Sequence, residues 1–220
     1  MLCLGFSKEE TEDALIELSF LGIENVLALR GDTPNFQKTL RSDRSANNYA
    51  VDLVSQICDM REGKFLDEID RTDPLSFCVG VAAYPEKHFE AASLKVDIQN
   101  LKRKVDKGAE YIVTQMFFDN LKYFSFVKQC RDAGISVPII PGLKVLRATS
   151  QLKSIPKNFY IDFPDQLVEE IQSAPTHVEE IGLNWIKKQS LELLESGVPA
   201  VHFYVLNDVN SVVNIVKSLK

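Results

Sequence analysis

The sequence predicts an α/β fold of the (β/α)8 TIM-barrel type, incomplete, with about six of the eight β/α units. Short apolar runs alternate with longer helical patterns along the 220 residues, and these runs are nearly continuously apolar, as in a parallel sheet buried on both faces. Polar residues gather just past the expected strand ends, where barrels carry their chemistry. An open doubly wound sheet would place a GxGxxG turn after its first strand, and the chain has none.

Six strands are expected, at residues 2–5, 25–29, 77–82, 111–115, 137–140 and 200–204. Helical spacing of apolar residues predicts the segments between them. Ser7 and Glu10 form a capping box at the start of the first helix, and Gly22 ends it. Helices are expected at residues 7–21, 49–60, 89–107, 121–133, 150–155, 165–173, 178–196 and 209–219. No linker divides the chain, so we expect a single domain over residues 1–220.

The chain is acidic, with 25 basic and 31 acidic side chains and a net charge of −6. Such a chain is a poor candidate for non-specific binding of nucleic acid or of an anionic membrane, so any anionic ligand needs a local basic cluster. No apolar run reaches the roughly 18–20 residues of a membrane span. The four cysteines and three histidines show no metal-ligand spacing. We therefore expect no metal, and reduced thiols in a cytoplasmic protein.

Four polar residues near strand ends are candidates for ligand binding. Asp32 follows a strand and a glycine, and its carboxylate could tune a cofactor or move a proton, or simply cap a turn. Gln115 ends the fourth strand, where its amide suits the lactam edge of a heterocycle or the backbone groups of a loop. Tyr84 and His88 follow the third strand, and they could cover a flat cofactor or form a rigid turn. These alternatives remain open on the sequence alone.

One helix carries the densest basic cluster of the chain. Asp97, Asn100 and Lys104 fall at positions i, i+3 and i+7, which places them on one helix face, and Arg103 flanks that face. The polar groups could bind a ribose or adenine, and the two cations could bind a pyrophosphate. The alternative is a solvated helix face with salt bridges, which is the more common role of such a pattern.

Six sequence blocks occur in a fixed order along the chain: ALRGD at 28–32, VAAYPEKH at 81–88, LKRKVDKGA at 101–109, TQMFFD at 114–119, IIPG at 139–142 and HFYVLN at 202–207. One tripeptide would be weak support for a family, whereas six ordered blocks at compatible spacing are specific. Together they resemble the flavin-dependent methylenetetrahydrofolate reductases, and the resemblance covers essentially all 220 residues.

The resemblance implies a barrel that holds FAD at the C-terminal ends of its strands. In this family a reduced nicotinamide, NADH or NADPH, passes a hydride to FAD, and the flavin reduces methylenetetrahydrofolate to methyltetrahydrofolate for methionine synthesis. By the same resemblance, Asp32 is the acid beside the flavin, and Gln115 and Gln151 bind the folate. The implied FAD contacts are Arg30, Gly31, Asp32, Tyr49, Ala50, Ala82, Tyr84, His88, Asp97, Asn100, Arg103 and Lys104.

The sequence departs from the family pattern in three places. The family chain begins with two further β/α elements, which carry a general-acid glutamate and a flavin-side threonine that have no counterpart here. Met1 stands where the family has a flavin-contacting histidine, and Asp208 stands where it often has an arginine.

We therefore expect the isolated 220-residue chain to retain flavin weakly and not to reduce folate. The preferred hypothesis is a reductase that lacks the N-terminal part of the usual chain. The alternatives are one part of a split enzyme, or a flavin-binding remnant without catalysis. The family also tends to associate, which predicts a homo-oligomer.

Overall fold

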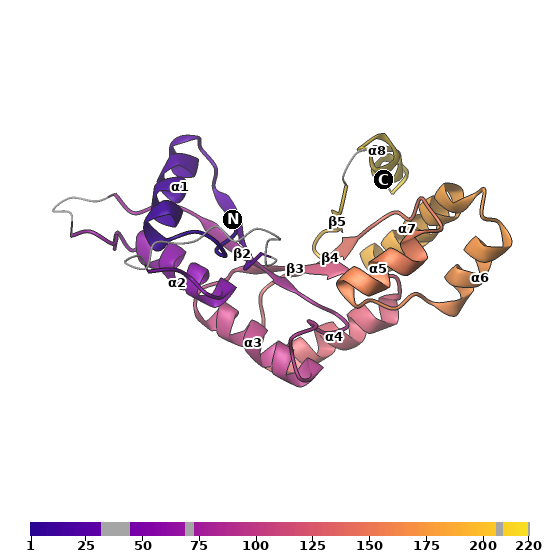
Figure 1. Ribbon diagram of the computed structural model, residues 1–220, viewed down its shortest axis with the longest axis horizontal. Coiled ribbons are helices and arrows are strands. Elements are labelled where there is room, and N and C mark those ends of the chain that lie inside the picture. The colour runs from indigo at the N-terminus through magenta and orange to yellow at the C-terminus, as the bar shows by residue number, and fades with distance from the viewer. Residues whose placement is uncertain (32–44, 69–72, 206–208, 220) are drawn as a thin grey trace. The chain divides into compact units, whose positions relative to one another are not determined.

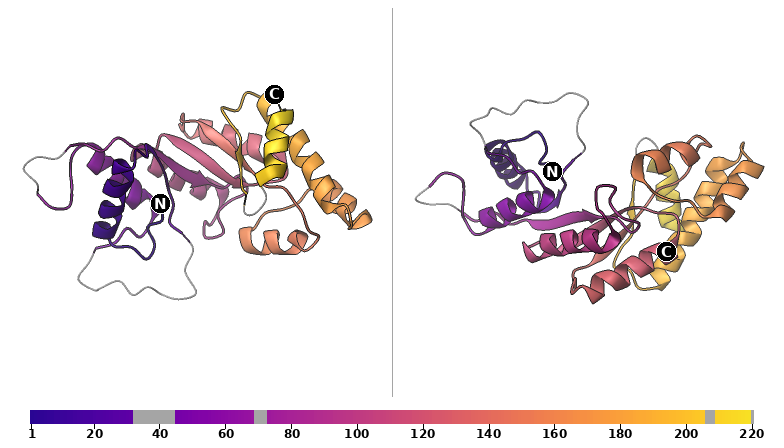
Figure 2. Two further views of the ribbon diagram at one scale, coloured as in Figure 1. Left: turned by 90° about the horizontal axis from the view of Figure 1, so that it is seen from above. Right: turned by 60° about the horizontal axis from the view of Figure 1, so that its bottom comes forward.

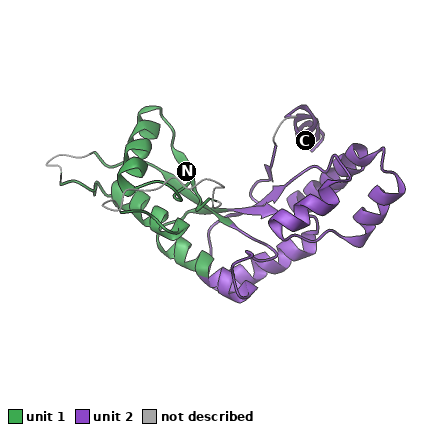
Figure 3. Cartoon of the chain, viewed as in Figure 1, with its two compact units in different colours: residues 1–82, 100–112 green, residues 83–99, 113–220 purple. Residues whose placement is uncertain are grey.

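The computed structural model describes residues 1–31, 45–68, 73–205 and 209–219 (Figure 1). The chain divides into two compact units, of which unit 1 comprises residues 1–82 and 100–112, and unit 2 comprises residues 83–99 and 113–220 (Figure 3). The expectation of a single domain over the whole chain stays a prediction.

The elements alternate as the sequence predicts, with strands and helices in succession. Their order is α1 (Lys8–Phe20), β1 (Asn25–Ala28), α2 (Ala50–Arg61), β2 (Cys78–Ala83), α3 (Leu94–Asp106), β3 (Tyr111–Met116), α4 (Asn120–Asp132), β4 (Ile139–Leu143), α5 (Gln151–Phe159), α6 (Asp165–Ser173), α7 (Val178–Glu195), β5 (His202–Phe203) and α8 (Val209–Ser218). No helix within the described ranges is long and apolar enough to cross a membrane.

The strands form one sheet in the order β1-β2-β3-β4-β5, and the β1–β2 and β4–β5 pairs are parallel. Sequential order without a reversal is the arrangement of a β/α barrel, whereas a doubly wound sheet reverses its order at a switch point. The predicted fold class, an incomplete barrel-type α/β fold, is therefore confirmed.

The first expected strand, residues 2–5, forms only a single parallel bridge, between Leu2 and Leu29. The Cys3 amide donates to the Leu29 carbonyl at 3.0 Å, and the Leu4 amide donates to the Arg30 carbonyl at 2.9 Å. Gly5 then turns the chain at φ +86°, so the pairing stops there. The segment follows β1 for too few residues to count as a strand, and five of the six expected strands form in the described residues.

In unit 1, α1 begins where the capping box predicts. The Glu10 amide donates to Ser7 Oγ at 3.1 Å, and the Ser7 amide donates to Glu10 Oε2 at 2.9 Å. The core of this unit lies under the first two strands, whose register pairs Val26 with Val79. Helix α2 packs on β1 and contributes the fully buried Leu53, so the sheet is covered by apolar side chains on this face.

In unit 2, helices α5, α6 and α7 enclose a second apolar core, and α8 lies beside α7 (Figure 2). Trp185 of α7 donates from Nε1 to the Phe118 carbonyl at 3.1 Å, which ties the helix to the segment after β3. The buried members of this core are Met116, Phe118, Leu146, Ile155, Ile161, Leu167, Ile171, Val178 and Ile181.

One helix boundary differs from the prediction in a way that affects the site. Helix α3 begins at Leu94, although the apolar pattern predicts a start at residue 89. Residues before Leu94 form a turn in which the Ala91 amide donates to the His88 carbonyl at 3.0 Å. The same turn leaves the His88 amide to the side chain of Asp97, so a local hydrogen bond replaces the first helical turn.

Gly182 of α7 offers a test of the unit 2 packing. A Cβ at this position would lie 2.1 Å from the Leu146 carbonyl oxygen, which is backbone and cannot rotate away. We expect Gly182→Ala to destabilise the protein by about 1–3 kcal/mol, against the usual gain of about 1 kcal/mol for alanine in a helix. Urea unfolding measures the change.

The matched control is Asn184→Ala, an exposed position on the same helix. It should leave the unfolding free energy unchanged or raise it by about 0.5 kcal/mol. A Gly182→Ala protein as stable as wild type would contradict the close contact with Leu146.

Candidate functional site

The C-terminal part of α3 contacts the end of β2 in unit 1. Lys104 donates from Nζ to the Ala82 carbonyl at 2.7 Å. Arg103, exposed on the same helix, donates from Nη2 to Asn100 Oδ1 at 2.5 Å. The structure thus brings together four of the sequence-predicted residues as two hydrogen-bonded pairs.

In unit 2, the segment after β2 carries Tyr84 and His88. The His88 backbone amide donates to Asp97 Oδ2 at 2.8 Å, so α3 fixes the segment at this point. The His88 ring nitrogen Nδ1 accepts from the Glu90 amide at 3.2 Å, which requires that Nδ1 is unprotonated. The Tyr84 and His88 rings meet edge to face with centroids 4.7 Å apart. Tyr84 and His88 thus lie in a turn in which their rings contact each other. Their role as a cover for a flat cofactor stays a prediction.

The rings continue into a row that the sequence did not predict. The His88 ring stacks on Phe89 with centroids 4.7 Å apart, and Phe89 stacks on Tyr160 at 5.2 Å with planes 17° apart. We call Tyr84, His88, Phe89 and Tyr160 the aromatic row. Two of its four side chains are exposed, Phe89 at 51% and Tyr160 at 58%. No spacing rule could have joined the last ring, because it comes from the end of α5, far along the chain.

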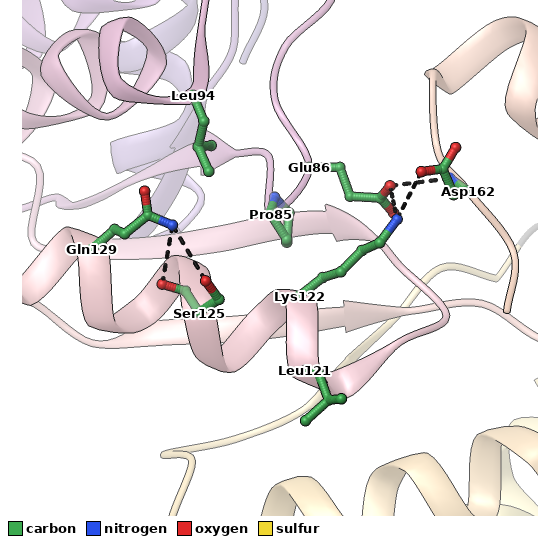
Figure 4. Close-up of a pocket in the computed structure, with 8 residues that line it drawn as sticks. All are labelled: Pro85, Glu86, Leu94, Leu121, Lys122, Ser125, Gln129 and Asp162. Atoms are coloured by element: carbon green, nitrogen blue, oxygen red, sulfur yellow. Dashed lines mark hydrogen bonds and ion pairs between the residues drawn. The ribbon is translucent and has the colours of Figure 1, made fainter.

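An ion-pair network also lies against the segment after β2 (Figure 4). Lys122 of α4 donates from Nζ to Glu86 Oε2 at 2.5 Å and to Asp162 Oδ2 at 2.9 Å. The Asp162 amide donates to the same Glu86 oxygen at 3.1 Å. These three residues, the ionic triad, line a pocket of about 410 Å³ together with Pro85, Leu94, Leu121, Ser125 and Gln129.

Burial and ion pairing act in opposite directions within the ionic triad. Burial raises the pKa of Glu86, and the hydrogen bonds from Lys122 and the Asp162 amide only partly offset this. Burial disfavours the ammonium of Lys122, but its hydrogen bonds to both carboxylates outweigh that effect and raise its pKa. The hydrogen bond from Lys122 lowers the pKa of Asp162. The proton is therefore held on the lysine.

The two predicted folate-side glutamines both use their side-chain carbonyl on the backbone. Gln115 Oε1 accepts from the Met116 amide at 2.9 Å. Gln151 Oε1 accepts from the amides of Arg147 and Ala148 at 2.6 and 3.0 Å, at the start of α5. Gln115 thus bonds the backbone of the next residue in β3, and the folate-side role of both glutamines stays a prediction.

A hydrogen-bond network fixes the strand ends next to Gln115. Thr114 is fully buried, and its Oγ1 accepts from the Gly142 amide at 2.9 Å. The Tyr204 hydroxyl donates to the Thr114 carbonyl at 2.9 Å. Three successive strand ends, those of β3, β4 and β5, are joined by these bonds, and the position of Gln115 follows from them.

The remaining predicted residues lie at two other places in unit 1. Arg30 and Gly31 follow β1 after one intervening residue, and Gly31 takes φ +88°. Tyr49 is the N-cap residue of α2, 60% exposed, and Ala50 is the first residue of that helix. Asp32, the predicted acid, lies outside the described residues.

No group of three or more metal-ligating side chains occurs in the parts of the chain that the structure describes. All four cysteines are free thiols. Cys3 and Cys130 are buried, and burial raises the pKa of the Cys130 thiol to about 12. Cys58 and Cys78 are half-buried, and that all four thiols are reduced in the cell stays a prediction.

The sheet order and the alternation of strands and helices define a β/α-barrel-type protein. The family model described as methylenetetrahydrofolate reductase matches residues 1–220. The chain belongs to the methylenetetrahydrofolate reductase family.

Two curated relatives illustrate the similarity. The probable methylenetetrahydrofolate reductase (NADPH) of Caenorhabditis elegans is 30% identical over 223 residues, which cover 100% of this chain and 31% of the relative. The methylenetetrahydrofolate reductase (NADH) 1 of Zea mays is 31% identical over 231 residues, covering 100% of this chain and 37% of the relative. The chain thus spans about a third of the length of these relatives.

One solved structure supports the fold at low identity. It is an uncharacterized protein from Clostridium thermocellum, described as binding two copies of 5-methyl-5,6,7,8-tetrahydrofolic acid. Its TM-score is 0.58 at 15% identity, and the match covers 100% of this chain and 71% of that one.

Tyr204 provides a pH-dependent test of the network beside Gln115. Burial raises the pKa of Tyr204 to about 12, above the unfolded value of about 10. The folded state therefore holds this proton more tightly, and the stabilisation is present below about pH 10 and lost as the pH rises towards 12. We expect Tyr204→Phe to cost about 1 kcal/mol near neutral pH, measured by urea unfolding.

Tyrosinate absorbance should also show one late-titrating group fewer in Tyr204→Phe than in wild type. Tyr160→Phe is the control, because that side chain is exposed and sits outside the network. Equal stability of the Tyr204→Phe and Tyr160→Phe proteins would contradict the bond to Thr114.

Proposed function

We propose that this chain carries the cofactor and folate sites of a flavin-dependent methylenetetrahydrofolate reductase. The reaction proposed is hydride transfer from NADH or NADPH, through FAD, to 5,10-methylenetetrahydrofolate, which yields 5-methyltetrahydrofolate. The observation that carries the proposal is the family match over residues 1–220. The relatives named above for NADPH and for NADH support a nicotinamide co-substrate of either kind.

The residues on α3 fit the phosphates of FAD. A dinucleotide pyrophosphate is a dianion, and a chain of net charge −6 needs local cations to hold it. Lys104 donates to the Ala82 carbonyl, which places its ammonium group beside the end of β2. Arg103 is likewise bonded to the neutral amide of Asn100. We propose that these two cations bind the pyrophosphate.

We propose the further FAD contacts from the family resemblance. In unit 2, Tyr84 and His88 offer ring surface and Asp97 holds the backbone of His88 in place. In unit 1, Arg30, Gly31, Tyr49 and Ala50 are the proposed contacts. Bound FAD would supply the hydride relay between nicotinamide and folate, while the protein supplies position and charge.

On the folate side, Gln115 and Gln151 are proposed to bind the substrate through their side-chain NH2 groups. The carbonyl of each is engaged by backbone amides, which fixes the direction in which the amide can donate. Asp32 is proposed as the acid beside the flavin. The described ligand of the Clostridium thermocellum protein, a methylated tetrahydrofolate, supports a folate as the ligand class.

The setting follows from the same proposal. A folate reductase of this kind works in one-carbon metabolism and methionine synthesis, in the cytoplasm and as a homo-oligomer. The folate is a small-molecule partner, and we propose no nucleic-acid or membrane partner for this acidic chain.

Lys104→Met tests the cofactor site. The 220-residue chain is mixed with FAD, and binding is followed by the quenching of flavin fluorescence. We expect Lys104→Met to bind FAD about tenfold more weakly than wild type, because it removes a charge-assisted contact to the pyrophosphate. Riboflavin, which lacks the pyrophosphate, should bind equally to both proteins.

Lys107→Met is the matched control, since it removes one exposed positive charge just past the end of α3. It should change FAD affinity by less than about twofold at moderate salt. Equal weakening of FAD binding by both substitutions would show that the effect comes from net charge and not from a specific contact. A wild-type chain with no affinity for FAD would contradict the proposal.

A further inference from the structure

We propose that Glu86 is a positioning residue that holds the segment 84–89 in place through the ionic triad, and so sets the position of the Tyr84 and His88 rings. The consequence for FAD rests on the function proposed above, because it assumes that these rings contact the cofactor. The positioning itself depends only on contacts within unit 2.

The first support is the way in which Glu86 joins three separate segments. Its Oε2 accepts from Lys122 on α4 at 2.5 Å and from the Asp162 amide, in the segment between α5 and α6, at 3.1 Å. The close-up shows the side chains of Glu86, Lys122 and Asp162 converging from different elements (Figure 4). A single carboxylate thereby fastens the segment after β2 to two elements that come later in the chain.

The aromatic row joins the same two loops independently. His88 stacks on Phe89, and Phe89 stacks on Tyr160, which lies two residues before Asp162. Segment 84–89 and segment 160–162 are thus connected once by rings and once by charge. Tyr160 is also the C-cap residue of α5, and the first residue of that helix is Gln151. The contacts of Tyr160 therefore connect the segment 84–89 to the helix that carries a proposed folate-side glutamine.

Backbone strain marks both loops. Lys87 at φ +120° and Tyr160 at φ +57° are the non-glycine residues with positive φ in the described part of the chain. Such conformations cost of order 1 kcal/mol or more and persist where surrounding contacts over-determine them. One of these residues follows Glu86 directly and the other ends the aromatic row, so both positive-φ residues lie next to the contacts of the triad and the row.

Glu86 differs from an ordinary surface partner in its burial. Its side chain is 12% exposed, and its Oε1 is buried without a hydrogen-bond partner in the structure. Burying a carboxylate whose hydrogen-bonding capacity is only partly used costs free energy. The same burial raises the pKa of Glu86. By contrast, the Lys128–Asp132 pair on α4 has side chains that are 80% and 67% exposed, and such pairs contribute little. The ionic triad is therefore expected to hold position in a way that this surface pair does not.

His88 is fixed from two sides. Asp97 holds its backbone amide from the α3 side, and Glu86, two residues earlier, holds the segment from the α4 side. Without the Glu86 contact, the segment keeps the Asp97 bond and the local bonds from the Glu90 and Ala91 amides to His88. The His88 ring should then move relative to Tyr84 and Phe89 without loss of the fold.

The experiment uses the full 220-residue chain with Glu86→Gln and Lys122→Met, each of which removes one charge of the pair. The protein has three histidines, so labelled imidazole NMR signals are few, and His88→Gln assigns the signal of His88. Lys128→Met, which breaks the exposed pair on the same helix, is the matched control. Circular dichroism confirms that each variant is folded.

We expect Glu86→Gln and Lys122→Met to shift the His88 imidazole signals and to leave those of His177 and His202 in place, with no shift in Lys128→Met. We expect both variants to bind FAD about fivefold more weakly than wild type. Unchanged His88 signals in the two variants would overturn the positioning role. Shifted signals with unchanged FAD affinity would overturn its consequence for the cofactor.

The two proposals fail separately. If the wild-type chain does not bind FAD, the proposed function falls, and the NMR comparison still decides whether Glu86 positions His88. If wild type binds FAD and Lys104→Met weakens it while Glu86→Gln changes neither signal nor affinity, only the positioning role is wrong.

Discussion

Two carboxylates, those of Asp97 and Glu86, hold the segment that follows β2 in place. Tyr84 and His88 of the candidate site lie in this segment, so their positions depend on the same two groups. Asp97 accepts a hydrogen bond from the backbone amide of His88, and Glu86 accepts one from the ammonium group of Lys122. The first bond replaces the opening turn of α3, and the second reaches a different helix. Since hydrogen bonds to charged groups contribute about 1.5–3 kcal/mol each, two of them can hold a strained segment that contains no regular structure.

The sequence predicts the repeating architecture well because the signals for each strand and helix lie within that segment of the chain. Apolar runs, the Ser7–Glu10 capping box and the helical spacing in α6 and α7 require only neighbouring residues to be read. The errors occur where a side chain competes with the backbone. Asp97 takes the His88 amide and delays α3, and the turn at Gly5 shortens the first expected strand to one bridge.

The candidate site divides in the same way. Helical periodicity places Asp97, Asn100 and Lys104 on one face of α3, and the strand ends place Gln115. The partners of these groups are not local, because Tyr160 and Asp162 come some seventy residues after the segment they hold. Glu86 stands inside the block at 81–88, in which the family resemblance implies roles for Ala82, Tyr84 and His88. The role of Glu86 follows only from the position of Lys122. A pattern within the sequence contains no information about that pairing.

The basic cluster at residues 102–104 shows why the choice of partner matters more than the count of charges. Lys102 forms an ion pair with Asp106 one turn along α3, so its charge is largely cancelled, as in an ordinary solvated helix face. Lys104 instead donates to the neutral carbonyl of Ala82, and Arg103 donates to Asn100. Lys102 thus has the pairing of a solvated helix face, whereas Lys104 links the helix to the end of β2. In a chain of net charge −6, cations gathered near a strand end provide the local positive potential that an anionic ligand needs.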